Sequence, residues 1–193
     1  MLEKVFYTSV LVTDQDRALD FYTNVLGMEK RVENRTPDGP RFLTVGVTGF
    51  VHIGLVVEDL EETVRFLALL GFDCGEPGVF GGEWIDRIIG LENATVEVVM
   101  ARAPDGSDVF EVVRFRSPSG GAGEPAPAAN RPGLRHVAFK VDDVRGVVDR
   151  VRAAGWDTVG EIVDFESTFL LCYVRGPEGL IVELAERIDR APG

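Results

Sequence analysis

The stretch VHIGLVVEDLEETVRFLALLGFD, residues 51–73, decides the fold because the chain repeats it as RHVAFKVDDVRGVVDRVRAAGWD, residues 135–157. The two copies align without a gap and place His52 on His136, Asp59 on Asp143 and Gly71 on Gly155. Repetition at a fixed offset is the signature of a duplicated structural unit. The sequence therefore predicts two equivalent modules in one chain.

Each copy begins with the pattern of a strand. Apolar residues alternate along 51–57 and again along 137–141, which is typical of a strand with one buried face. The opposite face carries a histidine and, two residues later, a small residue: His52 with Gly54, and His136 with Ala138. We expect each histidine to face an open space rather than the core.

An amphipathic helix follows each strand. Apolar residues recur at helical spacing, at Leu60, Val64 and Leu67 in the first copy and at Val144, Val147, Val148 and Val151 in the second. Asp59 stands three residues before Glu62, which is the spacing of a capping box, and Gly71 and Gly155 are natural helix ends.

Further strands complete each copy. They are predicted at Gly82–Ile88, Val96–Ala101 and Val109–Phe115 in the first copy, and around Ile162, at Phe169–Val174 and at Leu180–Leu184 in the second. The segments APDG (103–106) and GPEG (176–179) have turn composition. Each copy is therefore predicted to be a βαβββ module.

The domain boundaries follow from this repeat. We place the first module at residues 49–116 and the second at 134–187, followed by a tail at 188–193. The segment between the modules, 117–133, is rich in Gly, Pro and Ala, which indicates a linker or surface loop.

Residues 1–48 align as a partial third copy. Asp14 matches Asp59 and Phe21 matches Phe66, but a hairpin around the TPDG turn ends the unit early. Tyr7 stands where the histidine would be, so we expect a βαββ half-module without metal ligands. Its apolar helix face is expected to be buried; it comprises Leu19, Tyr22, Val25 and Leu26. The half-module either adds strands to another chain, which would favour a homodimer, or is a structural appendage.

Composition excludes several classes of protein. The chain of 193 residues has 45% apolar residues and a formal charge of −12, which allows a sizeable core and disfavours nucleic acid and anionic lipid as partners. No apolar run approaches a membrane span, so a cytoplasmic location is expected. Two cysteines in unrelated contexts suggest neither a disulfide framework nor a thiolate metal site.

Four residues stand out as candidates for chemistry. The two histidines of the chain, His52 and His136, occupy equivalent repeat positions, and Glu111 and Glu183 each lie inside an otherwise apolar strand. A glutamate there needs a partner. Two imidazoles and two carboxylates suit a divalent ion such as Zn, Ni, Co, Mn or Fe(II). Alternatively, the glutamates pair with arginines, for which Arg114, Arg135 and Arg175 are candidates, and the histidines are structural.

These motifs resemble the vicinal oxygen chelate superfamily, which includes glyoxalase I, methylmalonyl-CoA epimerase, extradiol dioxygenases and the bleomycin and fosfomycin resistance proteins. The resemblance rests on VHIGLVVEDLEETVRFLALLGF, LRHVAFKVDDV and VRGPEGLIVELAE. It implies an α+β fold in which paired βαβββ modules form a half-open mixed β barrel. It also implies one metal ligand from the first and last strand of each module: His52, Glu111, His136 and Glu183.

The resemblance implies an enzyme that binds a small substrate through adjacent oxygens. The metal stabilises an enediolate or another oxyanion, and Glu183 or Glu111 acts as the base. A glyoxalase I-like or epimerase-like isomerase or lyase fits best. A fourth ligand disfavours the dioxygenases, which use two histidines and one carboxylate. A drug-binding or metabolite-binding protein without turnover is the alternative; in either case Trp84, Tyr173, Phe169 and Phe80 line a pocket or belong to the core.

Overall fold

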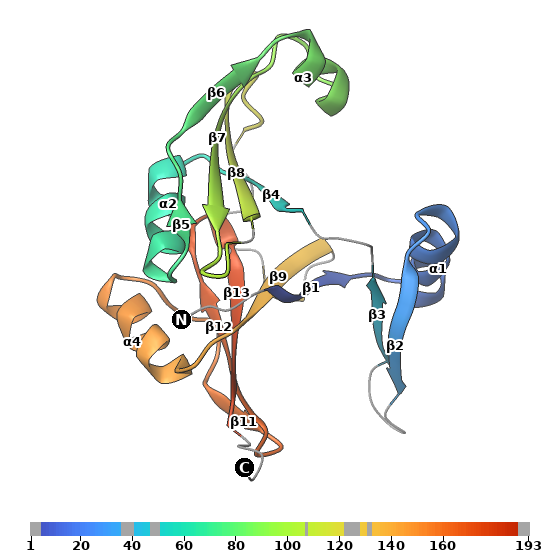
Figure 1. Ribbon diagram of the computed structural model, residues 1–193, viewed down its shortest axis with the longest axis vertical. Helices are drawn as coiled ribbons and strands as arrows, with labels where there is room; N and C mark the ends of the chain where they lie inside the picture. The colour runs from blue at the N-terminus through green and yellow to red at the C-terminus, as the bar shows by residue number, and fades with distance from the viewer. Residues whose placement is uncertain are drawn as a thin grey trace.

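The computed structural model describes residues 5–35, 41–46, 51–106, 108–121, 128–130 and 133–188. The hairpin turn predicted at 36–39, part of the predicted linker and nearly all of the tail lie outside these residues. Within them the chain is a mixed α+β protein with three β-sheets (Figure 1).

The first module forms a sheet with the strand order β4-β8-β7-β5, and β6 also pairs with β7. Its elements are β4 (Ile53–Val56), α2 (Leu60–Leu69), β5 (Asp73–Cys74), β6 (Gly78–Gly81), α3 (Glu83–Ile89), β7 (Thr95–Arg102) and β8 (Asp108–Ser117). The first and last strands, β4 and β8, are parallel neighbours.

The second module repeats this topology with the order β9-β13-β12-β10, and β11 pairs with β12. Its elements are β9 (Gly133–Lys140), α4 (Val144–Ala153), β10 (Asp157–Thr158), β11 (Val163–Phe165), β12 (Phe169–Arg175), the 3-10 helix η2 (Pro177–Gly179) and β13 (Ile181–Arg187). Here β9 and β13 are the parallel neighbours. The paired modules predicted from the repeat are confirmed.

The N-terminal segment is divided between two places. Its first strand, β1 (Val5–Leu11), pairs antiparallel with β9 and so extends the sheet of the second module. The helices α1 (Gln15–Asp20) and η1, a π-helix (Phe21–Val25), and the hairpin of β2 (Glu29–Arg35) and β3 (Arg41–Gly46) lie to the right of both modules in Figure 1. The half-module therefore does not form one sheet of its own.

The aspartate N-caps predicted at the helix starts are present, but Glu62 does not complete the predicted capping box, because the Asp59 backbone N–H donates to Glu178. The Asp59 carboxylate accepts a hydrogen bond from the Glu62 backbone N–H at 2.8 Å, and Asp143 does the same for Gly146 at 2.9 Å. Such N-caps each stabilise a helix by about 1 kcal/mol. Gly71, with φ +100°, lies beyond the C-terminal end of α2, where a left-handed backbone is needed.

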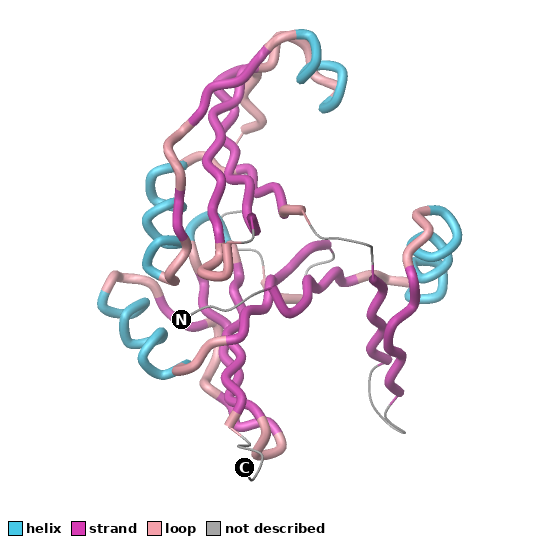
Figure 2. Tube along the Cα trace, in the orientation of Figure 1, coloured by secondary structure: helices cyan, strands magenta, loops and turns pink. Residues whose placement is uncertain are grey.

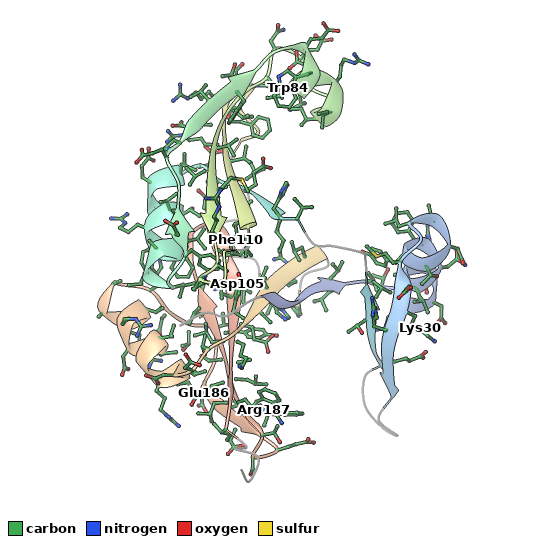
Figure 3. All side chains as sticks on the ribbon, viewed as in Figure 1. Lys30, Trp84, Asp105, Phe110, Glu186 and Arg187 are labelled. Carbon is green, nitrogen blue, oxygen red and sulfur yellow. The ribbon has the colours of Figure 1, made fainter. Side chains whose placement is uncertain are left out.

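A shared aromatic core joins the two modules. The Phe72 ring lies 5.4 Å from Phe110 of the first module and 5.2 Å from Phe139 of the second, measured between ring centroids. Phe66 and Trp156 make a second edge-to-face contact between modules at 5.0 Å. The helices α2 and α4 lie on the same side of the molecule (Figure 2), and Phe110 lies near its middle (Figure 3).

The loops at the seam also interlock. The Glu178 carboxylate of η2 accepts hydrogen bonds from the backbone N–H groups of Glu58 and Asp59, at 2.7 and 2.8 Å. A side chain of the second module therefore satisfies the turn that leads into α2 of the first.

The strand predicted at Gly82–Ile88 is wrong. Residues 83–89 form helix α3, not a strand, because Gly82 and Gly90 bracket the segment and Gly90 adopts the left-handed conformation at its end. Asp86 in this helix accepts hydrogen bonds from the backbone of Asn93 and Ala94, which fixes the turn into β7.

The helix face of the N-terminal segment is not buried in this chain. No residue of α1 or η1 is buried, and Val25 and Leu26 are 66% and 52% exposed. The expected burial of this face is wrong for the single chain because the segment's first strand leaves it to pair with β9.

Candidate metal centre

The first module brings His52 and Glu111 together. His52 immediately precedes β4, and Gly54, two residues later, is the register partner of Glu111 on β8. The His52 Nε2 atom lies 3.5 Å from Glu111 Oε2. Both side chains are partly open to solvent, at 37% and 36% exposure.

The second module brings His136 and Glu183 together in the same way. Ala138, two residues after His136, is the register partner of Glu183 on β13. The His136 Nε2 atom lies 3.0 Å from Glu183 Oε2, and both side chains are nearly buried. The parallel pairing of the first and last strands therefore produces the same histidine–glutamate contact twice.

Tyr173 adds a hydroxyl to the second pair. Its hydroxyl oxygen lies 3.3 Å from His136 Nε2, and the two rings pack with centroids 4.7 Å apart. Burial, with a smaller effect of the Glu183 charge, raises the pKa of Tyr173 to about 12, so the phenol stays protonated at neutral pH. Tyr173 and Glu183 therefore both approach the nitrogen that a metal would need.

The two pairs remain separate. Among the described residues there is no group of three or more His, Cys, Asp or Glu side chains arranged to hold a metal ion. Instead, residues of β4 and β9 line one cavity of about 180 Å³, which includes Gly54, His136 and the buried Thr63. A second hollow, of about 340 Å³ beside α2 and Trp156, contains none of the four candidate residues.

The donor atoms within each pair suit a divalent metal. Two ligands bound to one ion at about 2.1 Å lie about 3.0 Å apart at right angles and about 3.4 Å apart in a tetrahedron. The observed separations of 3.0 and 3.5 Å match this range. Each pair thus fits half of a four-ligand site in both donor chemistry and spacing.

Arg114, one of the arginines predicted as an alternative partner, pairs with Glu97 on β7. Arg114 and Arg116 both donate to Glu97 Oε2 on β7, and Arg114 also contacts Glu61. The Arg114 hydrogen bond lowers the pKa of Glu97. Glu97 lies in an apolar strand like the two candidate glutamates, and the sequence prediction missed it, although two arginines in the facing strand β8 signal its partners.

The four predicted pocket aromatics divide into two groups. Tyr173 and Phe169 lie on β12 of the second module, and Tyr173 touches the candidate site. Trp84 on α3 and Phe80 on β6 are 59% and 46% exposed and so do not belong to the core. Figure 3 shows Trp84 at the far end of the first module.

An apolar surface continues from Glu111 along its face of the first sheet. Met100 is the register partner of Glu111, so Val98 and Val96 lie on the same side of β7. Farther along, Ile85 of α3 packs over this face in a cluster with Ala94, Val96, Val98, Val113 and Phe115. The carboxylate therefore stands at the edge of an apolar patch.

In the part of the chain that the structure describes, no helix combines the length and apolar character that a membrane crossing requires.

Comparison with known proteins identifies a matching superfamily. Residues 51–173 and, separately, residues 4–47 match profiles of the Glyoxalase/Bleomycin resistance protein/Dioxygenase superfamily. No protein of curated function matches the chain.

Solved structures agree with these matches. A glyoxalase family protein from Bacillus cereus is 33% identical, with a TM-score of 0.69, over 74% of this chain and 96% of that one. A glyoxylase/bleomycin resistance protein/dioxygenase domain from Frankia sp. is 17% identical, with a TM-score of 0.53, over 76% of this chain and 96% of that one; it shows the fold alone. The chain belongs to the Glyoxalase/Bleomycin resistance protein/Dioxygenase superfamily.

Proposed function

We propose that this protein is a divalent-metal enzyme that moves a proton, or breaks a bond, next to a pair of oxygens on a small substrate. The observation that carries the proposal is the repeated histidine–glutamate contact, which the same strand register generates in both modules. A structural role for the histidines does not require a carboxylate at the equivalent place each time. The reaction class is an isomerase or lyase of the glyoxalase I or epimerase kind.

His52, Glu111, His136 and Glu183 would hold the metal. When bound, a Zn, Ni, Co, Mn or Fe(II) ion acts as a Lewis acid that stabilises negative charge developing on a substrate oxygen. The two carboxylates offset the ion's charge, and the neutral imidazoles supply the other donors.

We assign the two glutamates different roles. Glu183 is buried and close to His136, so it is held in one position and suits a permanent ligand. Glu111 is 36% exposed and lies farther from its histidine, so it can reach a substrate carbon. Glu111 is therefore the proposed general base.

The same face suggests the shape of the substrate. The two substrate oxygens would bind next to the histidine–glutamate pairs. The apolar patch that begins at Met100 and Val98 suits a short hydrocarbon portion of the substrate. We propose a small hydroxycarbonyl compound or a branched acyl thioester as the substrate class.

Proton exchange in D2O tests the reaction class directly. The metal-loaded protein is incubated with 2-oxoaldehyde hemithioacetals or with 2-methyl acyl thioesters, and NMR follows loss of the proton beside the carbonyl. Exchange should disappear in Glu111→Gln, whose metal content is measured in parallel. The matched control is Glu92→Gln, which removes an exposed carboxylate of the same module outside the proposed site.

A binding protein without turnover is the second candidate, and the separation of the two pairs favours it. In that case ligands bind without metal, no proton exchange occurs with any substrate, and the Ala variants of the histidines keep full affinity. Exchange of the substrate proton that depends on Glu111 would eliminate this candidate.

A further inference from the structure

The N-terminal strand β1 pairs with the edge of β9 opposite to β13, the strand that carries Glu183. In that sheet β9 has β13 on one side and β1 on the other. In the first sheet β4 pairs with β8, and no described strand pairs with the other edge of β4. Because β4 and β9 line the same cavity, β4 is an unpaired edge close to an edge already taken (Figure 1).

The repeat alignment shows that β1 and β4 carry equivalent residues. The partial copy matches the first module at an offset of 45, so that Tyr7 corresponds to His52 and Ser9 to Gly54. In the structure Tyr7 is the register partner of Ala138, and Ser9 is the register partner of His136. If β4 took the place of β1 in this register, His52 would lie opposite Ala138 and Gly54 opposite His136.

The pairing of β4 with β9 in this register would be self-complementary, which the pairing of β1 with β9 is not. Ala138 is the repeat equivalent of Gly54, and His136 is the equivalent of His52, so exchanging the two modules reproduces the same set of pairs. Such self-complementary pairing is the signature of two equivalent units related by a two-fold axis. Each histidine would then face a small residue, and no described atom lies within 4 Å of a Cβ placed at Gly54.

We propose that β1 and β4 are alternative partners of the same edge of β9, and that the four-ligand metal site forms when β4 replaces β1. This inference rests on the proposed function, because it uses the same four residues. With β1 in place the site is split into its two halves. With β4 in place His52 and His136 become diagonal neighbours across one strand pair, within reach of a shared ion.

The seam contains two irregular features. The β1–β9 ladder contains two register shifts, between Val5 and Tyr7 and between Ser9 and Val10. The Thr63 hydroxyl, which borders the cavity, is buried and has no hydrogen-bond partner among the described residues.

Metal concentration would then set the balance between the two arrangements. An ion that binds the assembled site and not the split one stabilises the β4 arrangement by mass action. The N-terminal segment therefore acts as a built-in competitor that keeps the protein in the split state until metal is available. Its release exposes β1 for pairing elsewhere.

Two alternative disulfides in the full-length chain test this exchange. Val10 is the register partner of Leu134 on β9, and both side chains are exposed, so Val10→Cys with Leu134→Cys locks β1 in place. If the pairing of His52 with Ala138 and of Gly54 with His136, here called the symmetric register, continues along β4 without a shift, Val56 lies opposite Leu134. Val56 is also exposed, so Val56→Cys with Leu134→Cys locks β4 in place. Paired residues of antiparallel strands lie within disulfide reach.

The expected result is that both disulfides form, each detected by mass spectrometry without reductant. Calorimetric titration with Co²⁺ should show binding at least about 100-fold weaker in the β1-locked protein, because loss of an outer-shell partner alone costs about 10- to 100-fold. Reduction should restore binding, and the β4-locked protein should bind at least as tightly as wild type. The single variant Leu134→Cys is the matched control.

The outcomes separate this inference from the proposed function. If the Val56–Leu134 disulfide fails to form while the Val10–Leu134 disulfide forms, or if the β1-locked protein binds Co²⁺ as tightly as its reduced form, the strand exchange is overturned. If both disulfides form and neither protein binds metal, the exchange stands and the metal-dependent function falls. The native thiols should not interfere, because burial raises the pKa of Cys74 to about 11 and also raises that of Cys172.

Discussion

His136 and Glu183 form the more buried of the two histidine–glutamate pairs, with Nε2 3.0 Å from Oε2. In the absence of metal these groups satisfy each other across the β9–β13 ladder. The pair therefore contributes to stability as well as to the proposed site, and its counterpart in the first module contributes less because it is solvated.

Replacing Glu183 should therefore destabilise the protein more than replacing Glu111. We expect Glu183→Ala to lower the free energy of unfolding by about 1–3 kcal/mol, since it removes the buried carboxylate that contacts the His136 imidazole. Glu111→Ala should cost less than about 1 kcal/mol. Urea unfolding without metal measures both, and equal losses would contradict the different burial of the two pairs.

Removing the Tyr173 hydroxyl should strengthen metal binding. The hydroxyl lies 3.3 Å from the nitrogen of His136 that the metal needs, so binding has to break this contact. We expect Tyr173→Phe to lower stability without metal by about 1 kcal/mol and to raise metal affinity about fivefold. Calorimetric titration checks this. Weaker binding in the variant would show that the hydroxyl supports the bound state instead.

Enlarging Gly54 should block metal binding without unfolding the protein. Open space surrounds the position, so Gly54→Leu should fold with wild-type circular dichroism and thermal stability. In the symmetric register the new side chain would lie against His136 and prevent the two histidines from meeting. Gly54→Ala, which copies the residue found at 138, is the matched control and should bind normally. Normal metal binding by Gly54→Leu would refute this register.

Acid should destabilise the protein through Glu97. Because its arginine partners lower its pKa, Glu97 stabilises the folded state above the unfolded pKa of about 4.3, and this contribution is lost as the pH falls through the lower folded value. Between pH 6 and pH 3, Glu97→Gln should therefore lose less stability than wild type. Glu92→Gln should follow the wild-type curve. Parallel curves for wild type and Glu97→Gln would exclude this role.

The repeat predicts much of the fold because its signals are local. The caps at Asp59 and Asp143 and the stop at Gly71 each depend on a few neighbouring residues, and the structure contains all of them. The four candidate residues could be selected for a related reason. A polar residue at the same place in two apolar strands needs a partner, and strand periodicity fixes its face.

The pairing of β1 with β9 could not be predicted in this way. The N-terminal strand and β4 share one pattern, and nothing in either sequence states which of them reaches β9. Helix α3 was missed because Trp84, Ile85 and Ile88 suit a strand or a helix in so short a segment, and Gly90 settles the choice through its left-handed conformation. Long-range competition and short ambiguous segments thus mark the limit of the prediction.

The most direct test of the central claim is the metal content of the purified protein after loading and dialysis, determined by elemental analysis. Wild type is compared with single Ala variants of His52, Glu111, His136 and Glu183. The account predicts about one divalent ion per chain in wild type and loss of the ion in a variant from either module. No bound metal in wild type, or loss confined to the variants of one module, would contradict a single site shared by the two modules.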